Sequence, residues 1–222
     1  MKQLLQLILI ISLTSCSPNR TSEIENNPTF NKIFTITEIA DLDHLYNFFN
    51  ASICSDNDRL NSEECYANFL EQLRNSADAK NGDYDLNIPF EKQKEAYKGI
   101  TDSTFNEIWR LSWKMMYKPT DTLQNLYLWN NGKYADFLKE VGKTDPVINQ
   151  YSNSFQASGD MSPSMRAGVL MNYKYYNIKD VRVRFIIAIH YMTLNDNHYR
   201  IEKYNPELSD IRWIPFRMKQ SP

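Results

Sequence analysis

The sequence predicts a mostly α-helical protein with a single globular domain, built as a bundle-like array of helices. Three observations support this prediction. Apolar residues recur at helical spacing along most of the chain, residues that favour helix N-caps precede these segments, and prolines and glycines stand mainly at their ends. A chain of 222 residues is long enough to bury the core of one such domain.

The expected helices have recognisable starts. Thr35 and Glu38 fit a capping box, in which two side chains satisfy backbone N–H groups at the helix start. Asp145-Pro146 and Ser162-Pro163 each place a capping residue before a proline at the first helical position. Residues 75–88 look like a long loop. The expected helical segments are, in chain order, residues 35–49, 61–73, 89–99, 104–117, 120–129, 133–141, 145–155 and 162–173.

The segment 104–117 carries two tryptophans at helical spacing. Thr104 and Glu107 fit a second capping box, and Trp109 and Trp113 would then share one face of the helix. Such a pair could form a platform for a sugar, but aromatic side chains at this spacing more often pack into a core. We therefore expect this face to be buried.

Residues 180–195 allow two interpretations. Val181 to Phe185 alternates between apolar and basic residues, which favours a strand, and β-branched residues are frequent. The segment is long for a strand, however, and Asp180 is a good N-cap. We favour a buried central helix. The alternative is an α+β fold with a C-terminal antiparallel sheet at about residues 168–204.

The N-terminus has the pattern of a secretory signal peptide. A short start with Lys2 leads into an apolar run of about ten residues, too short to span a membrane, and small residues follow it. The run closes with Leu13-Thr14-Ser15-Cys16, which resembles the lipobox of bacterial lipoproteins. That resemblance implies that residues 1–15 are removed and that Cys16 becomes the acylated first residue, with palmitate as an expected chain. Ser17 favours the outer membrane.

The lipoprotein resemblance sets the expected domain plan and location. Residues 16–30, rich in Ser, Asn, Pro and Glu, are expected to form the lipidated cysteine and a flexible tether. Residues 31–222 are expected to form the globular domain. The protein would be lipid-anchored in the cell envelope, in the outer membrane and facing the periplasm.

Cys54 and Cys65 are expected to form a disulfide. They are the only cysteines besides Cys16, and thiols within reach of each other tend to pair in an oxidising compartment. A redox or metal-binding pair is the alternative, but the spacing is neither C-x-x-C nor a zinc pattern with nearby histidines. The bond would join two helix ends across a polar loop.

Charge is unevenly distributed along the chain. Residues 17–164 contain 14 basic and 22 acidic side chains, a net charge of −8, whereas residues 165–222 contain 10 basic and 5 acidic ones, a net charge of +5. The formal net charge of the whole chain is −2, which argues against nucleic acid as a partner. This uneven distribution could produce two opposed surfaces of opposite charge, or the two regions could neutralise each other within one domain. An acidic surface could steer a basic protein partner toward the protein.

No motif predicts catalysis, a cofactor or a metal. The serine-hydrolase and phosphate-loop patterns that would indicate an enzyme do not occur in the sequence. His190, His198 and Glu202 form the sole cluster that suggests zinc, at a spacing that fits no known motif, and His190 is expected at the edge of an apolar element. We therefore predict no catalytic, cofactor-binding or metal-binding residues, and a protein that is not an enzyme.

The candidate interface is aromatic and basic. Tyrosine combines an apolar body with a polar tip and is enriched in protein interfaces. The candidate interface residues are Tyr173, Tyr175, Tyr176, Arg212 and Trp213.

The resulting functional hypothesis is a lipid-anchored binding protein that faces the periplasm. The specific expectation is an immunity protein that neutralises a secreted antibacterial toxin, with the membrane engaged through the N-terminal lipid; the acidic surface would suit a basic toxin. The alternatives are an envelope assembly or structural lipoprotein and an unrecognised hydrolase.

Overall fold

The computed structural model describes residues 22–54, 61–80, 84, 86–115 and 122–204. Within them the protein is mostly helical, with one small antiparallel sheet, as the sequence predicted. The elements are α1 (Pro28–Ile33), α2 (Ile36–Ile53), α3 (Ser62–Ala79), α4 (Phe90–Lys98), α5 (Asp102–Ile108), β1 (Trp109–Met115), β2 (Thr122–Leu128), α6 (Lys133–Gly142), α7 (Pro146–Ser158), α8 (Pro163–Met171), the short 3-10 helix η1 (Tyr173–Tyr175) and α9 (Val181–Tyr204).

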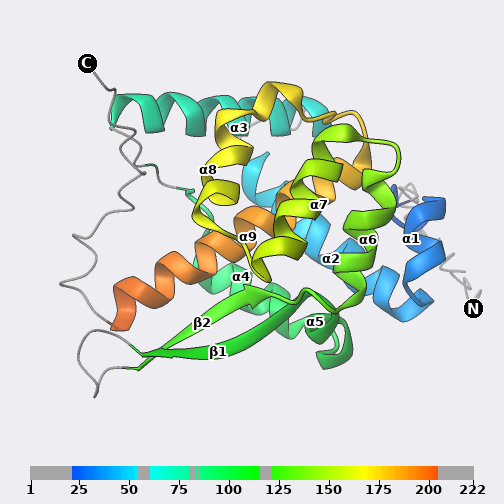
Figure 1. Cartoon of the computed structure of the whole chain (residues 1–222), viewed down its shortest axis with the longest axis horizontal. Coiled ribbons are helices and arrows are strands. Elements are labelled where there is room, and N and C mark those ends of the chain that lie inside the picture. The colour runs from blue at the N-terminus through cyan, green and yellow to red at the C-terminus, as the bar shows by residue number, and fades with distance from the viewer. Residues whose placement is uncertain (1–21, 55–60, 81–83, 85, 116–121, 205–222) are drawn as a thin grey trace, which may run out of the picture.

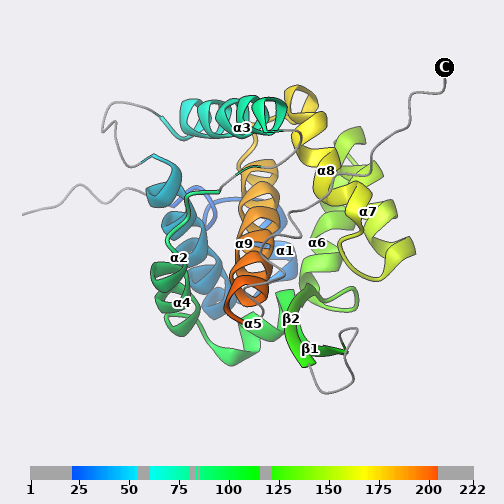
Figure 2. The ribbon, with the colours of Figure 1, turned by 90° about the vertical axis from the view of Figure 1, so that its left-hand side faces the viewer.

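The long helix α9 lies at the centre of the molecule. Helices α2 and α4 pack on one side of it, and α6, α7 and α8 lie on the other, with α3 across one end (Figures 1 and 2). Residues 183 to 197 of α9 are all buried. A helix surrounded on all sides buries all of its faces, which explains the lack of a single apolar face in its sequence. The polar residues that it buries, such as Arg184 and Asn197, form hydrogen bonds with other elements.

Residues 180–195 are therefore helical, and the alternative of a C-terminal sheet at 168–204 is wrong. Asp180 caps α9 by accepting a hydrogen bond from the Arg182 backbone N–H at 2.9 Å. The alternation of valine and arginine that suggested a strand has another cause. Arg182 pairs with Asp180 at the helix start, and Arg184 enters a buried polar network.

The sheet lies where helices were expected. Residues 109–115 and 122–128 form an antiparallel hairpin with Trp109 opposite Leu128 and Met115 opposite Thr122. The helix prediction was wrong because two tryptophans four residues apart also satisfy strand alternation. Trp109 is fully buried, as expected, but from a strand and not from a helix.

Side chains from outside the hairpin form hydrogen bonds with the edge of β2 that does not face β1. The Asn197 side chain accepts a hydrogen bond from the Leu126 N–H at 3.0 Å and donates one to the Leu126 carbonyl at 2.8 Å. Asp160 accepts a hydrogen bond from the Leu128 N–H at 3.2 Å. These side chains satisfy backbone groups that a third strand would otherwise pair.

The packed domain begins earlier than predicted. Ile24 and Phe30, both assigned to the flexible tether, are fully buried, and α1 starts at Pro28. The Ser22 hydroxyl donates to Asp43, and Glu23 forms an ion pair with Arg184. The tether prediction is therefore wrong for residues 22–30; residues 16–21 lie outside the part of the chain that the structure describes.

Two further boundaries differ from prediction. Helix α3 continues to Ala79 because Ala77 is buried in the core, so the loop expected from residue 75 starts later. Helix α5 is capped by Thr101, which accepts a hydrogen bond from the Thr104 N–H, and not by Thr104. Thr104 is buried and donates to the Asp41 carboxylate at 2.5 Å.

The expected starts of α2, α7 and α8 are confirmed by the capping contacts of Thr35, Asp145 and Ser162.

Cys54 and Cys65 form the expected disulfide, with their Cα atoms 5.3 Å apart. The bond joins the C-terminal end of α2 to the first turn of α3.

Replacing Cys54 with alanine should lower the free energy of unfolding by roughly 2–3 kcal/mol, because the disulfide between residues 11 positions apart no longer restricts the unfolded chain. Denaturation in non-reducing buffer measures this loss. The variant should also be insensitive to added reductant, and an unchanged midpoint in non-reducing buffer would rule out the expected contribution.

Candidate functional site

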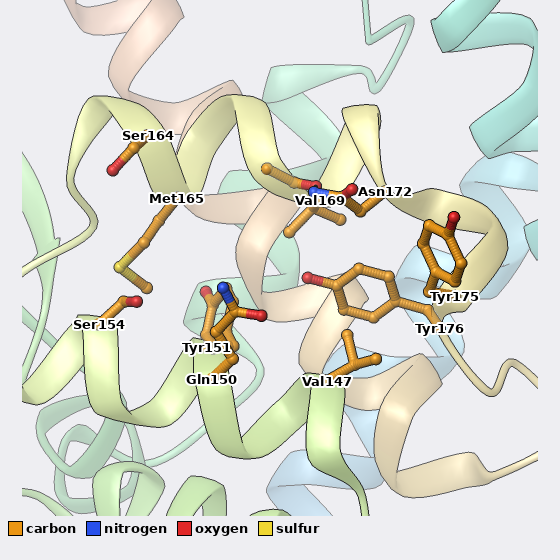
Figure 3. A pocket seen from close by; sticks show the side chains of 11 residues that line it. Val147, Gln150, Tyr151, Ser154, Ser164, Met165, Val169, Asn172, Tyr175 and Tyr176 are labelled. Carbon is orange, nitrogen blue, oxygen red and sulfur yellow. The ribbon is translucent and has the colours of Figure 1, made fainter.

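A pocket of about 390 Å³ opens between α7 and α8 and is closed at one end by η1 and the residue after it (Figure 3). Its size lies at the lower end of the range for ligand pockets in proteins. The residues that line it are Val147, Gln150, Tyr151, Ser154, Ser164, Met165, Gly168, Val169, Asn172, Tyr175 and Tyr176.

Local sequence signals place the two helices beside each other. Asp145 caps the start of α7, and Gly159 follows the last residue of this helix with a φ of 75°, a left-handed conformation that glycine adopts without strain. The chain then reverses, and α8 starts when Ser162 accepts a hydrogen bond from the Met165 N–H at 3.3 Å. A short turn between two helices brings their faces together and leaves the pocket between them.

A buried tyrosine–histidine pair lies below the pocket. Tyr151 Oη and His190 Nδ1 are joined by a hydrogen bond of 3.1 Å, and both side chains are buried. Burial lowers the pKa of His190 to about 3, and the positive charge of Arg166 adds to this lowering. Burial also raises the pKa of Tyr151 well above its usual value. Both groups are therefore uncharged at neutral pH.

Several polar side chains of the pocket are available to a ligand. The Gln150 amide and the hydroxyl groups of Ser154 and Tyr176 form no hydrogen bond with any other residue in the described part of the chain. In Figure 3 the Gln150 amide and the Tyr176 hydroxyl point into the space between the helices. Asn172, in contrast, already donates to the Gly168 carbonyl at 3.0 Å.

The lining of the pocket carries no formal charge. None of the lining residues is Asp, Glu, Lys, Arg or His. A charged group that entered the pocket would lose water without meeting an opposite charge, which is costly. The lining therefore suits an uncharged group.

Gly168 lines the pocket from the interior of α8. A glycine inside a helix is less stable than alanine by about 1 kcal/mol. A Cβ at position 168 would meet nothing within 4 Å, so the packing of the described residues does not require a glycine here. The space that a side chain at position 168 would occupy is therefore open and belongs to the pocket.

Two of the three predicted interface tyrosines, Tyr175 and Tyr176, line one end of this pocket, whereas Tyr173 is not part of its lining, and the exposure of the three differs. Tyr175 is 74% exposed at the rim, Tyr173 is half-buried, and Tyr176 is buried with its hydroxyl in the pocket. Met171, the last residue of α8, is 61% exposed. Cys16, Arg212 and Trp213 lie outside the described residues.

The histidines do not form a site with each other. His190 is buried at the centre of the molecule and not at the edge of an apolar element, whereas His198 is exposed. Across the described ranges, no group of three or more His, Cys, Asp or Glu residues could hold a metal ion. No described helix is long and apolar enough to cross a membrane.

Sequence reasoning missed most of the pocket. Gln150, Ser154 and Asn172 are ordinary polar residues for the exposed face of a helix, and nothing in their spacing distinguishes them. Gly168 gave the one usable signal, because it interrupts a segment that otherwise has helical periodicity.

Comparison of the chain with protein-family models, curated proteins and solved structures found no match.

Proposed function

We propose that this protein is a lipid-anchored, periplasm-facing binding protein, and that the surface formed by α7, α8 and η1 binds a protein partner. The finer proposal is an immunity protein that captures a secreted antibacterial toxin. One observation carries the binding role. Four large apolar side chains are exposed among the described residues, and one of them, Tyr175, lies in the lining of this pocket. Met171 is not part of that lining, and its sulfur accepts a hydrogen bond from Arg74 of α3.

Tyrosine is enriched in protein interfaces and suits a docking surface. A single exposed apolar residue needs no explanation by itself, but Tyr175 stands beside a pocket with unpaired polar groups, and this combination favours an occupant. The pocket is too small to be a whole interface, which usually buries more than 1,000 Å². We therefore place it at the centre of a larger contact surface.

The lipid anchor would hold the domain close to the bilayer. Only five residues lie between Cys16 and Ser22, where the packed domain begins, and the six residue steps from Cys16 to Ser22 span at most about 22 Å. The end of the molecule with α1 would then face the membrane. The hairpin and the C-terminal end of α9 lie at the opposite end in Figure 1 and would point away from it.

Replacing Tyr175 with alanine should weaken partner binding by at least about 10-fold, because aromatic residues at the centre of interfaces often contribute more than 1 kcal/mol. The free energy of unfolding should change little, since the side chain is largely exposed. The measurement is capture by the immobilised full chain in detergent, from envelope and secreted fractions, followed by mass spectrometry.

The matched control is Ile36 to alanine, which removes another exposed apolar side chain from a different helix, α2. It should leave capture unchanged. A toxin captured by the wild type and the control but lost with Tyr175→Ala would support immunity, whereas an envelope component would favour an assembly role. Equal capture by all three proteins would contradict the proposed binding surface. Mass analysis of the native N-terminal peptide tests the acyl group on Cys16.

A further inference from the structure

We infer that the pocket between α7 and α8 receives one uncharged aromatic side chain with a polar end, a tyrosine or a tryptophan, from the partner protein. This inference rests on the proposed function and names the part of the partner that the site recognises. Three properties of the pocket lead to it: the absence of charge in its lining, its unpaired polar groups, and its shape.

The first property excludes the charged anchors. A lysine or arginine side chain would enter a pocket whose lining has no carboxylate, and an aspartate or glutamate would meet no cation there. The acidic character of residues 17–164 can help a basic partner approach, but it does not extend into the pocket lining.

The second property excludes purely apolar anchors. A leucine, isoleucine or phenylalanine would cover the Gln150 amide and the Ser154 and Tyr176 hydroxyl groups without pairing them. Buried donors and acceptors without partners oppose binding. A tyrosine hydroxyl or an indole N–H offers these groups a partner at the far end of an apolar ring.

The third property is the shape of the space. Val147 rises from α7 and Val169 from α8 on the two sides of the pocket in Figure 3, so that apolar walls flank it. Gly168 has open space where a side chain would stand, which lets the incoming residue lie close to the α8 backbone. A ring between two apolar walls fits this geometry.

The test uses amino-acid amides as probes of the full chain in detergent. Saturation-transfer NMR should detect N-acetyl-L-tyrosinamide and N-acetyl-L-tryptophanamide with dissociation constants of about 1 mM, as expected for small fragments. N-acetyl-L-argininamide and N-acetyl-L-leucinamide should bind at least about 10-fold more weakly. Equal binding of all four probes would overturn the inference.

Two variants locate the binding to the pocket. Gly168→Phe places a ring in the pocket and should abolish the probe signal. Gly168→Ala adds only a methyl group in open space, so it should keep the fold and shows whether any side chain is tolerated at this position. Asn153→Ala, an exposed residue of α7 outside the pocket lining, should leave the signal unchanged.

A signal that persists in Gly168→Phe comes from detergent or another surface and overturns the inference. If Gly168→Phe does not fold, Gln150→Leu replaces it and should weaken tyrosinamide binding by about 5-fold or more; unchanged binding would again be contrary. Partner capture with the Tyr175→Ala variant is a separate measurement from probe binding. The inference about the pocket can therefore fail while the proposed binding surface stands, and the reverse also holds.

Discussion

Replacing Arg184 with methionine is expected to lower the free energy of unfolding by about 3–5 kcal/mol. The Arg184 side chain is only 2% exposed. Its guanidinium donates to the Tyr46 hydroxyl at 2.7 Å and to the carbonyl groups of Ile178 and Lys179 at 2.8 and 3.1 Å, and it pairs with Glu23. Methionine fills similar space but leaves the buried Tyr46 hydroxyl and the part-buried carbonyl groups of Ile178 and Lys179 without this donor, and an unsatisfied buried group costs about 1–3 kcal/mol.

Arg182 supplies a matched control two residues away. It is also an arginine on α9 with a carboxylate partner, Asp180 at 2.6 Å, but its side chain is 22% exposed. It also donates a long hydrogen bond of 3.3 Å to the Thr29 hydroxyl of α1. Arg182→Met should cost about 0–1 kcal/mol. Urea denaturation followed by circular dichroism compares the two variants. Similar losses would mean that Arg184 acts as a surface ion pair, and that the N-terminal segment from Ser22 is not fixed by this network.

The capped helices were predictable from local sequence alone. Thr35 with Glu38, Asp145 with Pro146, and Ser162 with Pro163 define their helix starts by contacts within four residues. Such signals do not depend on how the rest of the chain folds, so they survive in the structure.

The hairpin was not predictable in this way, because distant residues decide it. The spacing of Trp109 and Trp113 fits a helix face and a strand face equally well. What selects the strand is pairing with residues 122–128 and the hydrogen bonds from Asn197 to Leu126, which are 71 residues apart. The buried position of Ile24 likewise depends on contacts with the folded body, and composition alone made its segment look like a tether.

The candidate site was predicted in part. The tyrosines at 173, 175 and 176 could be singled out because they are close in sequence and amphipathic. The pocket beside them depends on how α7 and α8 lie against each other, and on the absence of a side chain at Gly168. Helix packing at this level of detail is set by the whole core, which a sequence pattern does not specify.

Lowering the pH from 6.5 to 5 should reduce the free energy of unfolding by about 1.6 kcal/mol through His190 alone. Burial lowers the pKa of His190 from 6.5 in the unfolded chain to about 3 in the folded protein. Between these values the unfolded chain binds a proton that the folded protein does not bind. The stabilisation is therefore complete above pH 6.5 and is lost progressively as the pH falls toward 3. Urea denaturation at a series of pH values measures the slope.

His190→Asn should remove this slope, because asparagine does not titrate and keeps a polar group near the Tyr151 hydroxyl. His198→Asn, an exposed position on the same helix, should retain it.

Burial raises the pKa of Asp196, so the contribution of this carboxyl group to the free energy of unfolding changes with pH in the direction opposite to that of His190. Comparing the two asparagine variants separates the two contributions. Because His190 stays neutral in the folded protein over this pH range, its hydrogen bond with Tyr151 persists, and probe binding to the folded protein should be the same at pH 6.5 and at pH 5. A His190→Asn variant with the slope of the wild type would contradict the buried, neutral imidazole.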